Sequence, residues 1–600
     1  MDNQKPFIRA EEVLLKVNKE WLHFTNPHRV IQTDALPKVV PALLEIEDLV
    51  QINGWHAAGF ISYEAAPAFD PAHQTQPGTG FPYLWFGLYP PPRSVSRIAN
   101  PTYNPKLSWL PTVDRNTYNT AIDRIKNYIA DGRTYQVNYT MRLQTDFEGT
   151  PWNFFLHLTQ TQNNHAAYLD LGRYVICTAS PELFFRLDGD LLTCRPMKGT
   201  AHRGRTTLED QEQAQWLKDS EKNRAENVMI VDMIRNDLGR IAKIGSVQVP
   251  ELFTVERYPT LWQMTSTIQA QTDASLTQIF RALFPCASIT GAPKVSTMRI
   301  ISELEASPRK IYTGSLGYIA PSRRATFNVA IRTALVDRLE KTAEYGIGGG
   351  IVWDSTAPDE YNEALLKSRV LTEVLPQFSL LETMLWSPEV GFFLRAKHIT
   401  RLLDSADYFD FSIRPWQSQS SVDSLGDLSS PSSSKEILDS YLDHISASFN
   451  SPRLVRLLLD KIGKLSSEVK AVEALVAKPL WKAYLAKRPV NSNDIFLFYK
   501  TTNREVYEAA RKDFPQYDDI LLYNERDELT EFTIGNLVVE MDNNLYTPPI
   551  SCGLLPGTFR EYLLETVKME ERIIPVEALK NCTKIFLVNS VRKWIQVRLE

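Results

Sequence analysis

A change of pattern at VLPQF, residues 374–378, constrains the fold of this chain more than any other sequence feature. Pro376 has no backbone N–H and cannot continue the helical pattern before it, so a helix must end there. A new series of strand and helix patterns starts at FSLLETMLW, residues 378–386. Because 600 residues exceed what one hydrophobic core usually supports, we predict a first domain over residues 1–375 and a second over residues 376–600.

Both blocks mix the two kinds of regular structure, which predicts an α+β class. The apolar runs YVICTA (174–179) and FNVAIRTALV (327–336) are typical of strands, and AENVMIVDMIRNDLGRIAK (225–243) has helical spacing. In the second block, the serine-rich segment 417–436 is too polar to bury apolar surface. We expect that segment to form a mobile surface loop.

Charge and hydropathy exclude several classes of protein. The formal net charge is -5, whereas a nucleic-acid binder needs a broad basic surface to neutralise phosphates. No long uncharged apolar stretch is present, and the start MDNQKPFIRAEEVLL lacks the basic-then-apolar pattern of a targeting segment. The five cysteines are scattered without a CxxC pair and are expected to be buried thiols. We therefore expect a cytoplasmic protein that acts on small molecules, with no membrane or nucleic-acid partner.

In the first block, Lys198 of RPMKGTAHRGR (195–205) is a candidate nucleophile. Pro196 and Gly199 restrict the backbone around it, which suits an amine that must be aimed at a reacting atom. Burial would lower its pKa and favour the nucleophilic neutral form. The alternative is an ordinary solvated lysine, because most lysines meet water.

Three carboxylates of the first block are candidate Mg²⁺ ligands. Glu360 and Glu363 lie three residues apart on a helix predicted after the flexible glycine run GIGGG (346–350), so they share a face. Glu226 lies on a second predicted helix, residues 223–240. Carboxylate oxygens are the ligands that Mg²⁺ prefers. The alternative is that all three belong to solvated helix faces.

Seven motifs occur in a characteristic order: SPELF, PMKGT, NRAENVMIVDMIRNDLGR, SITGAPK, YTGSLGY, AIRT and GIGGGIVWDSTAPDEYNE. Together they resemble, over most of residues 1–372, the chorismate-utilising enzymes, which include anthranilate, isochorismate and aminodeoxychorismate synthases. The resemblance implies two facing antiparallel sheets and chorismate as substrate. It also implies a Mg²⁺ ion held by Glu226, Glu360 and Glu363.

A few positions separate the branches of this family. Lys198 matches the PxKGT lysine of the aminodeoxychorismate branch, which adds to ring carbon 2 as the 4-hydroxyl departs, before ammonia adds at carbon 4. Anthranilate synthases resemble PxAGT there and carry a histidine where this chain has Gln278. Relatives that add water use a lysine at the position of Gln136. The resemblance favours amination at carbon 4, with an anthranilate synthase component I as the alternative.

The resemblance also assigns roles around the substrate. Glu182 of SPELF is similar to the acid/base group beside Lys198. The substrate-binding positions that it implies are Arg332, Tyr312, Ser288, Gly348 and Gly349. The chain has no GxCxG nucleophile elbow, so it cannot release ammonia from glutamine. We expect a separate glutamine amidotransferase subunit as partner, or the use of free ammonia.

The second block carries candidates for a Schiff-base cofactor, which needs a lysine, an acid beside the pyridine nitrogen and donors for the phosphate. Lys500 ends the strand-like segment IFLFYK, Glu531 lies in LTEFTIGN and Arg401 lies in AKHITRLLDSADYF. LLPGTFREYL could present backbone N–H groups at a helix start. Each of these charges taken singly could simply meet solvent.

In this order, and with GTFR and NSVR, the second block resembles the fold-type IV pyridoxal-phosphate enzymes over about residues 378–600. By that likeness Lys500 joins the cofactor and moves protons, while Glu531 holds the pyridine nitrogen. The likeness assigns the phosphate to Arg401, Thr558, Phe559 and Ser590.

The ending NSVRKWIQV resembles the lyase subgroup of that family. A lyase that expels pyruvate from 4-amino-4-deoxychorismate would yield para-aminobenzoate, a folate precursor, and would place both blocks in one pathway. The alternatives are a transaminase and an inactive docking domain. Fold-type IV enzymes commonly dimerise, which leaves a homodimer through the second block open.

Overall fold

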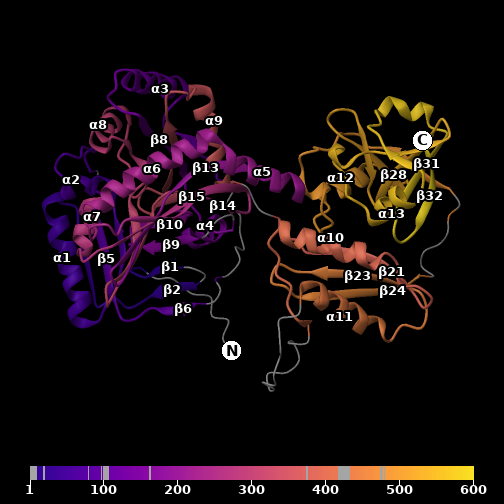
Figure 1. Cartoon of the computed structure of the whole chain (residues 1–600), viewed down its shortest axis with the longest axis horizontal. Coiled ribbons are helices and arrows are strands. Elements are labelled where there is room, and N and C mark those ends of the chain that lie inside the picture. Colours follow the sequence, from indigo (N-terminus) through magenta and orange to yellow (C-terminus); the bar gives the residue numbers. More distant parts are fainter. Residues whose placement is uncertain are drawn as a thin grey trace. The chain divides into compact units, whose positions relative to one another are not determined.

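The computed structural model describes residues 10–17, 20–78, 80–95, 98, 107–160, 164–372, 376–416, 433–472, 478 and 480–600. Its tertiary contacts group into two units. The first unit comprises Met1–Arg203 and Gln213–Leu375, and the second comprises Gly204–Glu212 and Pro376–Glu600. Helices and sheets occur in both units, so the predicted mixture of α and β structure is confirmed (Figure 1).

The first unit contains two ten-stranded sheets within the described ranges, and every strand pairing in them is antiparallel. One sheet has the order β16-β8-β20-β19-β10-β9-β1-β2-β6, with β7 paired to β8. Its strands are β16 (Gly291–Ala292), β8 (Gln136–Asp146), β20 (Thr342–Ile351), β19 (Thr333–Asp337), β10 (Tyr174–Ser180), β9 (His165–Asp170), β1 (Val13–Val17), β2 (Glu20–Phe24), β6 (Arg93–Val95) and β7 (Leu110–Pro111).

The other sheet has the order β13-β15-β12-β11-β18-β17-β4-β5-β3, with β14 paired to β15. Its strands are β13 (Met197–His202), β15 (Leu261–Gln271), β12 (Leu191–Arg195), β11 (Leu183–Asp188), β18 (Arg324–Val329), β17 (Ser315–Ala320), β4 (His56–Ile61), β5 (Leu84–Tyr89), β3 (Arg29–Thr33) and β14 (Gln248–Arg257).

The two sheets pack face to face through an apolar core. Leu169 and Ile176 of one sheet and Phe60 and Trp85 of the other are buried in the same cluster. Since large apolar side chains on strands must be covered on both faces, helices close the outer surfaces (Figure 1). The two facing antiparallel sheets expected from the family resemblance are therefore present.

One set of helices covers the outer face of the sheet that contains β13: α1 (Leu36–Asn53), α2 (Ala66–Phe69), α6 (Glu221–Gly239) and α7 (Leu276–Leu283). The other set covers the sheet that contains β20: α3 (Arg115–Ala130), α4 (Pro151–Leu158), α8 (Lys294–Leu304) and α9 (Ala357–Lys367). Helix α5 (Thr207–Asp219) starts within the segment that belongs to the second unit.

The second unit has two sheets. A four-stranded sheet, β22 (Gly391–Phe392), β21 (Leu380–Ser387), β23 (Arg453–Leu459) and β24 (Leu465–Ala471), packs on α10 (Arg395–Tyr408) and α11 (Ser434–Ser446). An eight-stranded sheet has the order β27-β26-β25-β32-β31-β28-β29-β30, and β27 also pairs with β28. That extra pairing closes six strands into a barrel around an apolar core.

The strands of this eight-stranded sheet are β25 (Trp481–Leu485), β26 (Asp519–Tyr523), β27 (Leu529–Phe532), β28 (Gly535–Met541), β29 (Asn544–Thr547), β30 (Met569–Glu571), β31 (Lys584–Asn589) and β32 (Lys593–Leu599). Two helices accompany it, α12 (Glu505–Asp513) and α13 (Thr558–Thr566).

Two local predictions were wrong. The segment IFLFYK is not a strand: Ile495–Leu497 form a 3-10 turn, because the carboxylate of Asp494 accepts a hydrogen bond from Phe496 N at 2.9 Å. The glycine run is not a flexible loop, because it lies inside β20 and pairs along its length with β8.

Two further segments differ from the sequence patterns. The predicted strand 327–336 is interrupted at Arg332, whose φ of 51° turns the chain between β18 and β19. Of the serine-rich segment, residues 417–432 lie outside the described residues, while Ser433 and Glu436 form the capping box that starts α11. No helix in the described ranges is long and apolar enough to span a bilayer.

Candidate active sites

Lys198 lies near the start of β13, and its backbone is fixed on both sides. Gly199 has a φ of +100°, which an L side chain rarely adopts, and a Cβ there would meet Asn223 at 3.1 Å. Asn227 of α6 donates a hydrogen bond to the carbonyl oxygen of Lys198 at 3.2 Å. The Lys198 Nζ lies 3.2 Å from Glu226 Oε2 on the same helix. Helix α6 thus positions both the backbone and the amine of Lys198.

Four glycines of β20 leave positions without side chains near this amine; we call Gly346, Gly348, Gly349 and Gly350 the glycine strand. A Cβ on Gly350 would lie 2.8 Å from Lys198 Nζ and 2.3 Å from Gln136 Nε2. A Cβ on Gly349 would lie 3.0 Å from Glu360 Oε2. A side chain on Gly350 would collide with Lys198 and Gln136, so glycine is required there for the amine and the amide to approach each other. Gly349 faces the opposite side of the strand, where glycine leaves room for Glu360.

Gln136 is thereby placed in the site, at the first residue of β8. It is 1% exposed, and its Oε1 atom is buried with no hydrogen-bond partner among the described residues. A buried amide oxygen without a partner is costly, so it is a candidate acceptor for a bound molecule.

Glu182 lies between β10 and β11 and is 2% exposed. Burial raises the pKa of Glu182 to about 7, although hydrogen bonds from Ser288 and Met197 and the charge of Lys198 act in the opposite direction. Ser288 donates its hydroxyl hydrogen to Glu182 Oε1 at 2.7 Å. A carboxyl group with this pKa can both release and accept a proton near neutral pH.

Arg332 and Tyr312 are linked through β20. Burial lowers the pKa of Arg332, and Tyr345 and Tyr258 are the groups whose charge would raise it. No carboxylate within the described ranges forms an ion pair with Arg332, so this desolvated cation is available to an anion. Tyr312 is 7% exposed, and a Cβ on Gly346 would overlap its ring at 2.2 Å.

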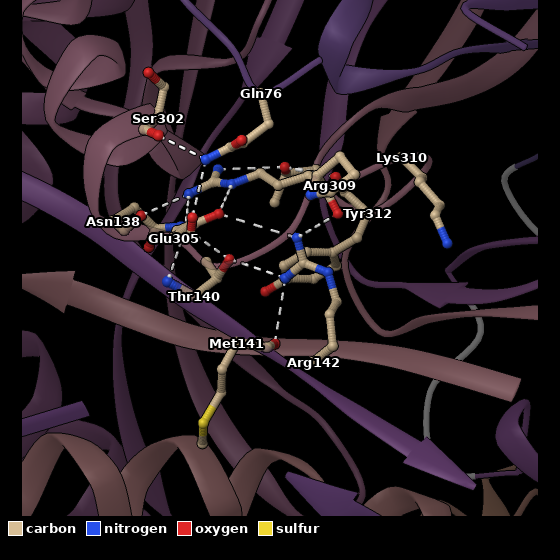
Figure 2. A network of polar contacts seen from close by, with 12 residues as sticks. Gln76, Asn138, Thr140, Met141, Arg142, Ser302, Glu305, Arg309, Lys310 and Tyr312 are labelled. Atoms are coloured by element: carbon tan, nitrogen blue, oxygen red, sulfur yellow. Dashed lines mark hydrogen bonds and ion pairs between the residues drawn. The ribbon is translucent and has the colours of Figure 1, made fainter. Parts of the chain in front are cut away.

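A buried ionic network, Glu305, Arg309 and Arg142, holds the segments around this site (Figure 2). Glu305 accepts hydrogen bonds from Arg309 at 2.6 and 2.9 Å and from the amide and hydroxyl of Thr140 at 2.9 and 2.8 Å. Arg309 also donates to the carbonyl of Ile289, next to Ser288, at 2.9 Å. The network therefore joins β8 to the SITGAPK segment.

Arg142 connects the network to Tyr312. Its guanidinium carbon lies 5.0 Å from the centroid of the Tyr312 ring, a cation–π distance, and it donates to Thr140 Oγ1 at 3.0 Å. Figure 2 shows the ring of Tyr312 beside Arg142. The position of Tyr312 depends on these buried charges.

The three predicted metal carboxylates have other partners in this structure. Glu226 contacts Lys198, Glu363 Oε1 lies 2.9 Å from Lys367 Nζ, and Ser355 donates to Glu360 Oε1 at 2.6 Å. Within the described part of the chain, no three His, Cys, Asp or Glu side chains lie close enough together to hold a metal ion. The donor type suits Mg²⁺, and like-charge repulsion from Glu363 contributes, after burial, to the raised pKa of Glu360.

In the second unit, Lys500 follows the 3-10 turn and pairs through its carbonyl oxygen with Leu381 N of β21 at 2.9 Å. Burial lowers the pKa of Lys500 to about 8. The charges of Arg401 and Arg504 act in the same direction, against those of Glu382 and Glu531. An appreciable fraction of this amine is neutral near pH 8, as a lysine that attacks an aldehyde requires.

Glu531 of β27 is 3% exposed and accepts three hydrogen bonds. The donors are Tyr507 Oη at 2.8 Å, Asn536 Nδ2 at 3.1 Å and Leu555 N at 3.2 Å. Burial raises the pKa of Glu531 to about 7, and the hydrogen bonds and the charge of Lys500 limit the rise.

Arg401 lies on α10 and donates to both oxygens of Glu382 and to the carbonyl of Pro556, just before α13. Thr558 and Phe559 are the first two residues of α13, whose free backbone N–H groups suit a phosphate. Ser590 is 8% exposed and its hydroxyl donates to Thr383 O at 3.4 Å. The predicted phosphate positions thus come from α10, α13 and the turn after β31.

Several groups were not found from the sequence. Glu382 and His398 lie in ordinary strand and helix patterns, and Glu305, Arg309 and Arg142 are indistinguishable from surface charges in sequence. Gln278 was noted for its type, but it caps α7: its side chain accepts from Ser275 N at 2.8 Å. A signal for Gln278 was available, since Ser-x-x-Gln before an apolar run is a capping box.

Comparison with known proteins gives matches for both units. The chorismate binding enzyme family model matches residues 10–373, and the amino-transferase class IV model matches residues 379–599. Aminodeoxychorismate synthase component 1 of Salmonella typhimurium is 41% identical over 268 residues, covering 44% of this chain and 59% of that protein. The chloroplastic aminodeoxychorismate synthase of Arabidopsis thaliana is 39% identical over 280 residues, covering 46% and 30%.

Each match therefore spans less than two thirds of the relative's own length. Among solved structures, anthranilate synthase component I from Streptococcus pneumoniae has a TM-score of 0.52 at 23% identity, covering 62% of this chain and 95% of that one. That likeness concerns the fold of the first unit.

Proposed function

The chain belongs to the chorismate binding enzyme family, and from that premise we propose that it makes 4-aminobenzoate in two steps. The first unit aminates chorismate to 4-amino-4-deoxychorismate with Mg²⁺. The second unit eliminates pyruvate with pyridoxal phosphate. The observation that carries the proposal is the placement of Lys198 against the glycine strand, next to Glu226 and near the buried acid Glu182. The names of the relatives that are 39–41% identical support the first step.

In the first step, Lys198 acts as the nucleophile. Its ammonium group lies 3.2 Å from Glu226 Oε2 and gives up a proton to solvent before it reacts. The neutral amine forms a bond to ring carbon 2 while the bond from carbon 4 to its hydroxyl breaks. Glu182 holds a proton below about pH 7 and gives it to the departing oxygen, so water leaves. Ammonia then bonds to carbon 4 as the bond between carbon 2 and Lys198 breaks, which restores the lysine.

The substrate carboxylates are held by Arg332, Tyr312, Ser288 and the amides of Gly348 and Gly349. The isolated, desolvated guanidinium of Arg332 supports its part in this assignment. Glu226, Glu360 and Glu363 would hold Mg²⁺, which would neutralise the dicarboxylate.

Ammonia must come from outside the chain. We expect a glutamine amidotransferase subunit to supply it, since the Salmonella relative is named as component 1 of its synthase. The reaction is expected to take place in the cytoplasm.

In the second step, Lys500 carries the cofactor and moves protons. Pyridoxal phosphate, when bound, supplies an electron sink for loss of the ring proton and release of pyruvate. Lys500 suits this role because its amine has a pKa of about 8. Glu531, fixed by Tyr507 and Asn536, would face the pyridine nitrogen of the bound cofactor and share a proton with it.

The residues proposed to hold the cofactor phosphate also suit that role. A Cβ on Gly557 would fall 1.9 Å from Asn536 Oδ1, so the turn before α13 must lack a side chain. Arg401, the amides of Thr558 and Phe559, and Ser590 would hold the phosphate.

The test is product identification from chorismate, Mg²⁺ and ammonium, with and without pyridoxal phosphate. Without the cofactor, protein freed of pyridoxal phosphate should accumulate 4-amino-4-deoxychorismate. With it, 4-aminobenzoate and pyruvate should appear in equal amounts. Aminated product without pyruvate in both cases would favour a transaminase or an inactive second unit, and 2-aminobenzoate would overturn the assignment of the first unit.

A further inference from the structure

Glu382 of β21 is a buried carboxylate that contacts two donor side chains, Arg401 and His398. It is 1% exposed, and Arg401 donates to its two oxygens at 2.8 and 2.7 Å. His398 Nδ1 lies 2.6 Å from Glu382 Oε2. Burial alone would raise the pKa of Glu382, but the charge of Arg401 and the hydrogen bond from His398 hold it at about 2. Glu382 is therefore a carboxylate at any physiological pH.

The guanidinium of Arg401 is only partly used by these contacts. An arginine has five N–H donors. Two go to Glu382 and one goes from Nη1 to the carbonyl of Pro556 at 3.0 Å. One N–H on each terminal nitrogen remains, in a plane that Glu382 fixes. Two fixed donors of one cation suit two oxygens of a phosphate.

His398 connects the same carboxylate to α13 through its second ring nitrogen. It is 1% exposed, and burial lowers its pKa below the usual range, so the ring is neutral. Because a carboxylate can only accept, Nδ1 carries the hydrogen and Nε2 is an acceptor. The hydroxyl of Thr558, 3.3 Å from Nε2, then donates to His398. The Thr558 side chain is occupied in this way, while its backbone N–H stays free at the helix start.

Both partners of Glu382 thus reach the same turn, residues 556–558. The preceding residue, Leu555, donates its N–H to Glu531 at 3.2 Å and accepts from Asn536 at 2.8 Å. One turn is therefore held from the pyridine side by Glu531 and from the other side by Glu382.

Resting on the proposed cofactor site, we propose that Glu382 and His398 are positioning residues for the cofactor phosphate. Glu382 sets the plane of the Arg401 guanidinium, and through His398 it fixes Thr558, so that the backbone N–H groups that start α13 and two N–H groups of Arg401 face one anion. The Thr558 hydroxyl acts on His398 and makes no direct contact with the phosphate.

The first test compares two ligands that differ only in the phosphate. Glu382→Gln is assayed in the full-length chain by visible absorbance titration with pyridoxal phosphate and with pyridoxal. We expect Kd for pyridoxal phosphate to rise by about 10- to 100-fold, as for other residues that orient a direct ligand. Kd for pyridoxal should change by less than about threefold, and Glu382→Asp should recover part of the loss. The matched control is Asp439→Asn, which breaks the Arg395–Asp439 pair, an arginine–carboxylate contact also made by α10, and should change neither value.

Equal weakening of both ligands by Glu382→Gln would overturn the proposal, because the residue would then support the whole site. If the wild-type chain attached neither ligand, the proposed cofactor site itself would be wrong, which is a distinct result.

The second test is a double-mutant cycle on His398→Phe and Thr558→Val with Kd for pyridoxal phosphate as readout. If the hydroxyl works through His398, the double variant should bind no more weakly than the weaker single variant. Additive losses would mean that Thr558 contacts the phosphate through its own hydroxyl, which contradicts the proposal.

Discussion

The two lysines proposed to form covalent bonds lie in opposite kinds of surroundings. Lys198 in the first unit pairs with a carboxylate, Glu226, and 19% of each side chain is exposed. Lys500 in the second unit is desolvated and has two guanidinium groups acting on it, which bring its pKa to about 8. A carboxylate partner favours the charged ammonium form of a lysine, whereas burial among cations favours the neutral amine. The two units therefore place their lysines in surroundings that favour opposite charge states.

Removing either amine should separate the two steps most clearly. We expect Lys500→Ala to lower pyruvate release by roughly a thousandfold or more, since a residue that bonds to the cofactor is not replaceable. 4-Amino-4-deoxychorismate should accumulate, because Lys198 and its surroundings are untouched. Liquid chromatography of the products measures both, with the exposed Lys487→Ala as control. Continued release of 4-aminobenzoate would remove Lys500 from the mechanism.

Lys198→Ala should have the reverse pattern. Amination of chorismate should fall by roughly a thousandfold or more, because the other amine beside the glycine strand, Lys367 Nζ, is held by Gly348 O at 3.0 Å and by Glu363 at 2.9 Å. The variant should still convert added 4-amino-4-deoxychorismate to 4-aminobenzoate. Lys218→Ala, at an exposed position of α5, is the control. Unchanged amination would show that Lys198 is not the nucleophile.

Glu182→Gln should affect the first unit alone, because it removes the acid that protonates the departing hydroxyl. General acid groups contribute about 10²–10⁴-fold, so kcat for amination should fall within that range. In the wild type, the acid form of Glu182 exists below its pKa of about 7, so the rate should fall as pH rises through 7. A pH–rate profile of ammonia-dependent amination measures this, and its decline near pH 7 should be absent in the variant. A decline that persists would assign it to another group.

The smallest expected effect concerns the cations near Lys500. Attachment of pyridoxal requires the neutral amine, so its rate should increase as pH rises through about 8. Arg504→Gln removes one charge that lowers the pKa of Lys500, and the midpoint should move upward, toward the ordinary lysine value. Stopped-flow absorbance at several pH values follows the shift. A midpoint that is unchanged or lower would mean that Arg504 does not lower this pKa.

More of the first site than of the second could be predicted from the sequence. The motifs around Lys198 and Glu182 sit where glycine and proline constrain the chain, and the structure explains the requirement: Gly199 has a left-handed φ, and Gly350 leaves room for an amine. The glycine run was wrongly predicted to be flexible, since strand pairing depends on a partner, β8, that lies more than 200 residues away in the chain.

In the second unit, Glu382 and His398 could not be found from pattern. An acid in the run LLETMLW has the same local sequence whether it faces solvent or a buried arginine. Only the packing of α10 on β21 brings Arg401 and His398 to it. Similarly, IFLFYK has the composition of a strand, and a single side-chain cap from Asp494 turned it into a 3-10 segment.

The most direct test of the proposed two-step reaction is to follow labelled nitrogen through the wild-type chain. Chorismate, Mg²⁺, pyridoxal phosphate and ¹⁵N-ammonium are incubated together, and the products are analysed by mass spectrometry and NMR. The account predicts 4-aminobenzoate with one ¹⁵N on carbon 4 and an equal amount of pyruvate. Label on carbon 2, next to the carboxylate-bearing carbon, or an aromatic product without ¹⁵N, would contradict it.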